Sequence, residues 1–482
     1  MKIILLALFC VPLVGFAQNF YVNNHITVAT GLGNYHPQIE VLGDNKLGII
    51  WTDAAGDDLY FVKQTGIDAF GSPVQLNPNG LDVQDYNWCG ADLAVWQNDV
   101  YVIFRSLGFS TGHIYAVKSQ DNGAIFGDTV RVDNLSAGYA QFPDIAVYND
   151  TVFVVMMVHD DMSGTNPQYA LTRSFDGGLS FDTPVVASAI VGNEACDCCQ
   201  PEIVVDDEKV MIFFRNNDAN TREIKASVSY DRGATFSDWI SVDDHNLVLA
   251  SCPSSGADAR LTDNDRVISA YRTAVGGVGK VFLNEYNVTT DVSENMIDVY
   301  MEGIANTGIN YPQVAYYNGA TAIVWEALGQ STDIYFNASS TGVTGIIPTN
   351  AINVTDTTGS QSKPDIVILN GQFHIVYTQL TGNEVKYVRI GSLVDLPETQ
   401  ELSWCTLFPN PTRDFAELKF TENLSGEITV KIYSVKGDLV QNFNQTVIGS
   451  STKLDLSTLE NGNYIVNVSI DNKQENFRIT KQ

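Results

Sequence analysis

Residues 119–126 have the sequence SQDNGAIF, residues 174–181 SFDGGLSF and residues 229–236 SYDRGATF. The three stretches share the pattern S-x-D-x-G-x-x-F, and they begin at residues 119, 174 and 229, which are 55 residues apart. An Asp can fold its carboxylate back onto the N–H groups of a tight turn, and a Gly supplies the positive φ that such a turn needs. The aromatic residue then packs the turn against its neighbour. The regular spacing predicts a β-rich unit that repeats along the chain.

The repeat extends on both sides of these three turns. Between about residues 36 and 391 a unit of about 50 to 58 residues recurs, a period typical of propeller blades. Its recurring openings are Pro37-Gln38-Ile39, Ala91-Asp92-Leu93, Pro143-Asp144-Ile145, Pro201-Glu202-Ile203, Ala257-Asp258-Ala259, Pro312-Gln313-Val314 and Pro364-Asp365-Ile366. Each opening is followed by a polar turn and an apolar strand. The strands alternate apolar and polar residues and are rich in Val, Ile, Tyr and Phe, which predicts antiparallel β-structure throughout.

The S-x-D-x-G-x-x-F pattern resembles the Asp box, or BNR repeat, of sialidase-like β-propellers, with Asp121, Asp176 and Asp231 as its acids. The resemblance implies an all-β propeller over residues 19–393. Asp boxes lie on the outer rim of such propellers, so these acids are expected to be structural. Seven openings favour seven blades, and six is the alternative if the fifth unit is irregular. Residues 21–28 are expected to supply the missing outer strand of the last blade and so close the ring.

The two ends of the chain predict export. Residues 1–17 combine a basic start, a short apolar run and small residues before a cleavage point, as a secretory signal peptide does. After a polar linker at residues 394–406, residues 407–482 begin with F-P-N-P and continue with I-Y-x-x-x-G and N-Y-I-V segments. This tail resembles the type A C-terminal sorting domain of cargo of the bacterial type IX secretion system, a small β-sandwich. The resemblance implies passage through the periplasm and release or anchoring at the cell surface, with the type IX machinery as a partner. A small immunoglobulin-like binding module is the alternative.

The chain is strongly acidic, with a net charge of −29 and 17% charged residues. Such a charge argues against nucleic acid as a partner, because phosphates would be repelled. It also disfavours adhesion to anionic lipid. This balance fits a soluble exported protein, which we expect to be a monomer.

The second strand of each blade should end at the mouth of the central channel. The residues at that position are Thr52, Arg105, Val158, Arg215, Arg272, Glu326 and Thr378. A planar guanidinium suits a carboxylate or sulfate, so Arg105, Arg215 and Arg272 are predicted to bind an acidic ligand. The alternative is that each Arg pairs with a neighbouring acid, such as Asp218, Glu223 or Asp258, and joins two blades.

Likeness to sialidases implies a Tyr nucleophile activated by a Glu, together with an Asp acid/base. The candidates at the mouth are Asp53, Asp160, Tyr271, Tyr311 and Glu326. No specific motif selects among them, and blade 1 carries Thr52 where the resemblance leads one to expect an arginine. Hydrolysis and binding without turnover therefore both stay open.

Five cysteines lie in loops that lead into first strands. They are Cys89, Cys196, Cys198, Cys199 and Cys252. In an exported protein we expect disulfides, with Cys89 or Cys252 joined to the C-D-C-C loop at residues 196–199. The alternative is a site for a soft metal such as Cu(I) or Zn, and no other cofactor is expected. Cys405, in the linker, is expected to stay separate.

These observations predict a secreted sialidase-like propeller that binds an acidic glycan or carboxylate ligand. As an enzyme it would be an exo-acting glycoside hydrolase. As a binding module it would be a surface lectin or adhesin. A third class is a surface protein that uses its cysteines for metal binding or redox chemistry.

Overall fold

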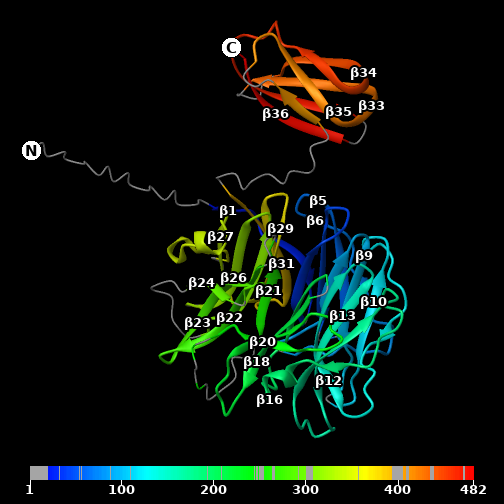
Figure 1. The fold of residues 1–482 in the computed structure, drawn as a ribbon, viewed down its shortest axis with the longest axis vertical. Helices are drawn as coiled ribbons and strands as arrows, with labels where there is room; N and C mark the ends of the chain where they lie inside the picture. Colours follow the sequence, from blue (N-terminus) through cyan, green and yellow to red (C-terminus); the bar gives the residue numbers. More distant parts are fainter. Residues whose placement is uncertain are drawn as a thin grey trace, which may run out of the picture. The chain divides into compact units, whose positions relative to one another are not determined.

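The computed structural model describes residues 20–392 and 405–481 apart from short gaps, and it divides the chain into two compact units, Met1–Pro397 and Glu398–Gln482 (Figure 1). Residues outside the description are 1–19, 32, 54, 56, 87, 109, 193, 208, 244, 246–247, 249–254, 263–265, 291, 300–307, 330, 356–357, 393–404, 409–411, 435–438, 471–472 and 482. The predicted signal peptide and most of the predicted linker lie among them. No helix in the described ranges has the length and apolar character needed to cross a membrane.

Within the described part of the first unit, seven antiparallel sheets follow one another in chain order. Blade 1 consists of β3 (Asn34–Val41), β4 (Leu47–Asp53), β5 (Asp58–Gly66), β6 (Ala69–Phe70) and β7 (Val74–Gln75). Blade 2 consists of β8 (Asp92–Trp96), β9 (Asp99–Arg105), β10 (Ile114–Ser119) and β11 (Val130–Arg131). Blade 3 consists of β12 (Tyr139–Tyr148), β13 (Thr151–His159), β14 (Gln168–Ser174) and β15 (Val185–Val186). Blade 4 consists of β16 (Glu194–Ala195), β17 (Glu202–Asp206), β18 (Lys209–Asn217), β19 (Ile224–Ser229) and β20 (Asp238–Ser241). Blade 5 consists of β21 (Ala257–Leu261), β22 (Arg266–Val275), β23 (Val278–Asn287) and β24 (Val292–Asp298). The sixth consists of β25 (Asn310–Tyr317), β26 (Ala320–Leu328), β27 (Thr332–Ser339) and β28 (Ile352–Asn353), and the seventh of β29 (Gln361–Leu369), β30 (Gln372–Gln379), β31 (Glu384–Ser392), β1 (Phe20–Val22) and β2 (Ile26–Thr30).

The described helices are three short 3₁₀ turns, η1 (Ser188–Val191), η2 (Val343–Gly345) and η3 (Pro348–Asn350). The predicted all-β class is therefore confirmed. The favoured count of seven blades is also the observed one. The fifth blade, suspected of being irregular, is an ordinary four-stranded sheet in the order β21-β22-β23-β24.

The core of the propeller is divided among the contacts between neighbouring blades. Each of the seven neighbouring pairs has its own cluster of buried apolar side chains. The cluster between the last and first blades contains Val376 and Tyr387 from blade 7 with Ile39 and Val62 from blade 1. The ring is thus closed by the same apolar packing that joins its other blades, at about 1.5–3 kcal/mol for each large side chain fully buried.

Closure of the ring uses the start of the described chain. β1 and β2 both pair antiparallel with β31, with Phe20 opposite Ser392 and Ile26 opposite Tyr387. The predicted role of residues 21–28 as the outer strand of the last blade is confirmed. The pairing covers an edge of β31 that would otherwise be open.

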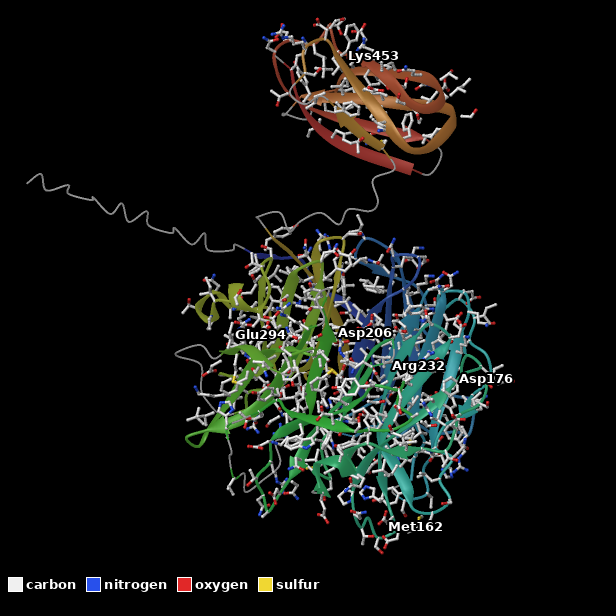
Figure 2. All side chains as sticks on the ribbon, viewed as in Figure 1. Met162, Asp176, Asp206, Arg232, Glu294 and Lys453 are labelled. Atoms are coloured by element: carbon white, nitrogen blue, oxygen red, sulfur yellow. The ribbon has the colours of Figure 1, made fainter. Side chains whose placement is uncertain are left out.

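The three S-x-D-x-G-x-x-F stretches fold into the same turn. In each, the Ser hydroxyl donates to the Asp carboxylate at 2.7–2.8 Å and accepts the Gly N–H at 2.8–2.9 Å. The glycines have φ of 75° to 91°, and a side chain at Gly233 would collide with Leu171 of the preceding blade. Phe126 packs edge-on against Phe61 of the preceding blade at 5.0 Å. Figure 2 shows Asp176 at the outer edge of the propeller, as expected for a structural turn.

A cation from the preceding blade binds each of these turns. Lys63 donates to the carbonyl of Asn122 at 2.9 Å, and Lys118 donates to that of Gly177 at 3.2 Å. Arg173 donates likewise to the carbonyl of Arg232 at 2.9 Å. The 55-residue spacing therefore applies to the donor as well as to the turn, and each pair links two blades at the rim.

The second unit is a β-rich unit with its own core. It consists of β32 (Cys405–Phe408), β33 (Phe415–Ser434), β34 (Leu439–Asp455), β35 (Gly462–Ile470) and β36 (Lys473–Lys481). The strands pair in the order β32-β33-β35-β36, and β34 also pairs with β33. Cys405, expected in the linker, is instead fully buried in the core of this unit beside Leu418 and Val430.

Candidate functional site

The seven inner strands surround a cavity of about 290 Å³. Its lining comes from β3, β8, β12, β17, β21, β25 and β29 and from the residues that lead into them. Because every blade contributes its opening, residues far apart in the chain meet around one axis. This cavity is the candidate site.

A backbone irregularity recurs where four of the blades open. His36, Phe142, Tyr311 and Lys363 each precede the proline of an opening, and each has a positive φ of 46° to 54°. The register of the inner strand shifts there, for example between Asn310 and Gln313. Left-handed φ is unfavourable for such residues, and bulges of this kind redirect side chains next to functional sites. Three of the four, all but Phe142, line the cavity.

His36 and Lys363 bring ionisable groups to the mouth of the cavity. The Nδ1 atom of His36 lies 2.6 Å from Oδ1 of Asp85, and both side chains are buried. The ammonium of Lys363 lies 5.1 Å from the centre of the Tyr35 ring. Burial lowers the pKa of Lys363, while Asp85, Glu326 and Cys89 act in the opposite direction. Lys363 therefore shares its surroundings with two carboxylates.

Tyr311 lines the cavity, and Glu326, which is not among the lining residues, lies near enough to act on it. Glu326, on β26, is 8% exposed and accepts hydrogen bonds from the Ser362 hydroxyl and from the Lys363 N–H. Burial raises the pKa of Glu326 to about 7. Burial also raises the pKa of Tyr311, and the charges of Glu326, Cys199 and Cys89 raise it further while Arg272 opposes them. The structure thus brings two predicted catalytic residues into one electrostatic neighbourhood.

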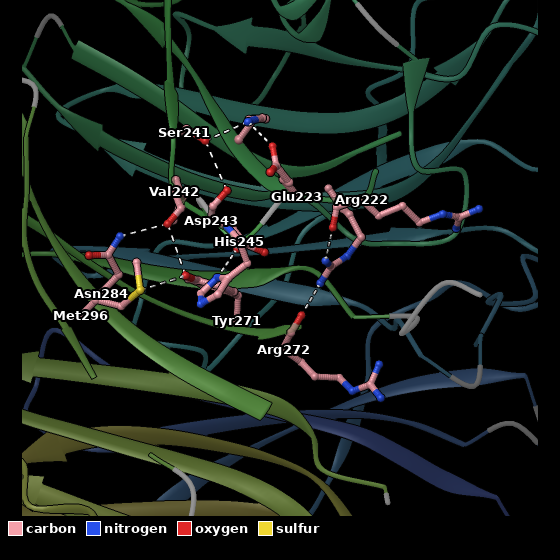
Figure 3. Close-up of polar contacts among 12 residues, drawn as sticks. Arg222, Glu223, Ser241, Val242, Asp243, His245, Tyr271, Arg272, Asn284 and Met296 are labelled. Atoms are coloured by element: carbon pink, nitrogen blue, oxygen red, sulfur yellow. Dashed lines mark hydrogen bonds and ion pairs between the residues drawn. The ribbon is translucent and has the colours of Figure 1, made fainter. Parts of the chain in front are cut away.

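The other predicted catalytic residues lie elsewhere. Tyr271 is fully buried, stacks on Phe282 and donates its hydroxyl hydrogen to the carbonyl of Val242 at 3.3 Å (Figure 3). Asp53 ends β4, where it accepts the N–H of Ala55 at 3.0 Å, and it is not among the residues that line the cavity. Asp160 accepts a hydrogen bond from the Asn166 amide at 3.0 Å in an exposed turn. None of these three shares the surroundings of Tyr311 and Glu326.

The three predicted ligand-binding arginines donate to backbone carbonyls. Arg105 donates to Ala140 of the next blade at 2.8 Å and to Ser106 and Gly108 of its own loop. Arg215, with no exposed surface, donates to the carbonyls of Arg222 and Arg272 at 3.0 and 2.7 Å (Figure 3). It also donates to the carbonyl of Ser255 at 3.2 Å.

Arg272 donates through Nε to the carbonyl of Ile309 in the next blade at 2.9 Å. Arg105 and Arg215 thus join neighbouring blades, with carbonyls as partners rather than the acids suggested by the sequence, and their role in ligand binding stays a prediction. Of the three arginines, Arg272 is half-buried, and its charge lowers the pKa of Tyr311. Arg272 therefore shares the surroundings of Tyr311 and Glu326.

Deeper in the cavity lies a ring of acids that sequence reasoning missed. The second residue of each opening is Gln38, Asp92, Asp144, Glu202, Asp258, Gln313 or Asp365. Four of the carboxylates accept the N–H of the next blade, at 3.3 Å for Asp92 to Ile145, 2.6 Å for Asp144 to Ile203, 2.5 Å for Asp258 to Val314 and 2.7 Å for Asp365 to Ile39.

Arg260 neutralises part of this ring, at 2.7 Å from Glu202 and 2.8 Å from Asp258. Burial raises the pKa values of Asp144, Glu202 and Asp365 well above the usual range, and that of Glu40 to about 6. The recurring acid in the openings was the sequence signal for this ring, whose hydrogen bonds hold the blades together.

Three of the predicted cysteines converge. Sγ of Cys196 lies 3.5 Å from Sγ of Cys198 and 3.9 Å from Sγ of Cys199. Cys89 lines the cavity separately, and burial raises its pKa far above the usual range. No disulfide joins the cysteines of the described residues, so the predicted bridge from Cys89 is not formed, and Cys252 lies outside them.

Comparison with known proteins characterises the tail. Residues 406–482 match the family described as "Secretion system C-terminal sorting domain". This stretch is a secretion-system sorting domain. It directs the protein through type IX secretion to the cell surface or beyond.

Solved structures resemble the chain distantly. An α-L-arabinanase of Penicillium chrysogenum, in complex with arabinobiose, matches 78% of this chain and 99% of its own at 9% identity and a TM-score of 0.45. A GH93 α-L-arabinofuranosidase of Fusarium graminearum matches 78% and 98% at 9% identity and a TM-score of 0.47. A Trypanosoma rangeli sialidase matches 95% and 89% at 10% identity and a TM-score of 0.40. No curated protein matches the chain significantly.

Proposed function

We propose that the exported propeller acts on an acidic glycan at the mouth of its channel, as an exo-acting glycoside hydrolase. The observation that carries this proposal is that Glu326 acts on Tyr311, which lines the cavity. Glu326 has a pKa of about 7, so it is close to half protonated at neutral pH and can both accept and donate a proton.

In this proposal Tyr311 is the nucleophile and Glu326 its base. The phenol oxygen forms a bond to the anomeric carbon while its proton passes to the Glu326 carboxylate. The bond to the leaving group breaks, and the departing oxygen takes a proton from a second acid. Water later displaces the tyrosine by the reverse transfers. His36, held at 2.6 Å by Asp85, is a suitable second proton carrier, because the carboxylate fixes the orientation of the ring.

Two cations support an acidic ligand. The charge of Arg272 acts on Tyr311, and Lys363 lies within the influence of Asp85 and Glu326. A sugar carboxylate bound beside Tyr311 would meet both cations.

The test is turnover of a panel of fluorogenic glycosides, with acidic and neutral sugars, by the full chain. Tyr311→Phe and Glu326→Gln should each lower kcat by about 10²- to 10⁴-fold. Lys363→Met should raise KM for acidic but not neutral substrates. Tyr115→Phe, on β10 at a position outside the cavity lining, is the matched control and should keep full activity.

Binding without turnover is the second candidate. It is favoured by the backbone hydrogen bonds of Arg105 and Arg215, which leave fewer cations to hold a substrate in the geometry that catalysis needs, while Arg272 and Lys363 can still bind a carboxylate. No turnover across the panel, with glycan binding that Lys363→Met weakens, would establish a lectin. Neither turnover nor binding would refute both candidates.

A further inference from the structure

The C-D-C-C stretch gathers three sulfur atoms at the entrance to blade 4. Cys196, Cys198 and Cys199 lie between β16 and β17, and their Sγ atoms are all within 4.8 Å of one another. Cys196 and Cys199 have no exposed surface, whereas Cys198 is half-buried. Cys196 and Cys199 are therefore shielded from solvent, and solvent reaches the group at Cys198.

The backbone of the loop fixes this convergence. The N–H of Cys196 donates to the carbonyl of Arg215 at 2.8 Å, which holds the loop to β18. The hydroxyl of Tyr169 donates to the carbonyl of Cys199 at 2.5 Å and lies 3.5 Å from that of Cys196. With both carbonyls held by one hydroxyl, the intervening turn brings the three sulfur atoms together. The arrangement is thus built into the fold before any ligand is present.

A guanidinium lies against the sulfur of Cys196. Nη1 of Arg222 lies 3.3 Å from Sγ of Cys196, and Nη2 of the same side chain lies 3.4 Å from Oδ1 of Asn220. The carbonyl of Arg222 in turn accepts a hydrogen bond from Arg215 at 3.0 Å. A cation in this position can offset part of the negative charge that bound thiolates bring to a metal site.

Two of the sulfur–sulfur distances are close to those expected for thiolates bound to a single metal ion. A metal–thiolate bond of about 2.3 Å places two sulfurs about 3.8 Å apart in a tetrahedron and about 4.0 Å apart in a trigonal plane. The observed separations are 3.5 and 3.9 Å. A disulfide needs about 2.05 Å, and three thiols can form at most one such bond among themselves.

We propose that Cys196, Cys198 and Cys199 together bind one thiophilic cation of the Cu(I) or Zn(II) class. Three thiolates from one buried loop suit a three-coordinate soft ion, so Cu(I) should bind more tightly than Zn(II). Binding replaces up to three S–H protons with three metal–sulfur bonds, and the protons pass to solvent. Arg222 then offsets part of the negative charge of the complex. Metal binding does not require the hydrolysis proposed above, although Cys199 also acts on Tyr311.

The experiment uses the reduced full chain under anaerobic conditions, titrated with Cu(I) against a chromogenic chelator and separately with Zn(II). The expected result is one ion per chain, a sulfur-to-copper charge-transfer absorption and proton release on binding. Cys198→Ser, which changes the half-buried member, should weaken binding by 100-fold or more with an unchanged melting temperature. Arg222→Met should weaken it by about 10- to 100-fold, as loss of an outer-sphere partner does.

Cys89→Ser and Cys405→Ser are the matched controls and should bind as the parent chain does. Equal affinity in Cys198→Ser would overturn the proposal. So would failure of the reduced chain to bind either ion. Protein exported by its own cells should be measured by intact mass as well. A mass 2 Da below the reduced form, caused by a disulfide between two of the three cysteines, would also overturn the proposal and assign the loop to redox chemistry.

Discussion

Replacing Glu326 with Gln tests whether the mouth of the channel holds a buried, ionisable carboxyl group. The side chain is 8% exposed, and burial raises its pKa from 4.5 to about 7. Gln keeps an oxygen that can accept the hydrogen bonds of Ser362 and Lys363 but cannot ionise. The variant therefore removes the charge while retaining the geometry.

The size and sign of the effect follow from the pKa. A rise from 4.5 to about 7 is about 2.5 pH units, which corresponds to about 3 kcal/mol. The folded state holds the proton more tightly than the unfolded state, so this contribution is complete below about pH 4.5 and is lost as pH rises through about 7. At pH 5 the two proteins should be nearly equal in stability. At pH 9 Glu326→Gln should be more stable by up to about 3 kcal/mol.

The measurement is urea unfolding of the full chain at pH 5, 7 and 9, followed by tryptophan fluorescence. Five of the six tryptophans lie between residues 51 and 325, so the signal reports mainly the propeller. Glu427→Gln, an exposed glutamate of the sorting domain, is the control and should shift nothing. The reasoning is refuted if the Glu326→Gln midpoint moves equally at pH 5 and pH 9, or if the variant is the less stable protein at pH 9.

Three further outcomes are expected from unfolding of the full chain. Asp176→Ala, which loses hydrogen bonds from Leu179 and Ser180, should cost about 1 kcal/mol at pH 7. Hydrogen bonds, chiefly from Ser180 and Ser174, lower the pKa of Asp176 to about 2. The contribution of the Asp176 carboxylate to stability should therefore be lost as pH falls from about 4 to about 2. An equal cost of the substitution at pH 7 and pH 2 would contradict this. Arg215→Met should cost several kcal/mol, because three buried carbonyls lose their donor; a shift under 1 kcal/mol would exclude the blade-joining role. His374 has its pKa lowered to about 4 by burial, so stability should fall between about pH 6.5 and 4, and His374→Gln should flatten that loss; an unchanged slope would count against it.

The fold was predictable because its signals are local and repeated. Seven openings of Pro or Ala, a polar residue and an apolar one mark seven inner strands, and the turn pattern marks the rim. The role of residues 21–28 followed from an edge that needed a partner. The cations that bind the turns were not predicted, since Lys63, Lys118 and Arg173 form no motif until the blades are stacked.

The site was predictable only in part. Sequence alignment of second strands placed Arg105, Arg215 and Glu326 at equivalent positions, and the structure keeps that equivalence, since each hydrogen-bonds to the next blade. Whether such a side chain turns toward the channel or toward a neighbouring carbonyl depends on the spacing between blades, which a single sequence does not contain. His36 and Lys363 escaped notice because their position depends on a bulge. The signal was present in the X-Pro pairs that begin the inner strands.

The pairing that completes the last blade joins residues 366 positions apart, as the bond from the Asn23 amide to the carbonyl of Arg389 illustrates. A chain that threads through a transporter cannot make this pairing until its final blade has emerged. Until then β1 and β2 have no partner strand. The architecture therefore delays completion of the ring until nearly all of the propeller is available to fold.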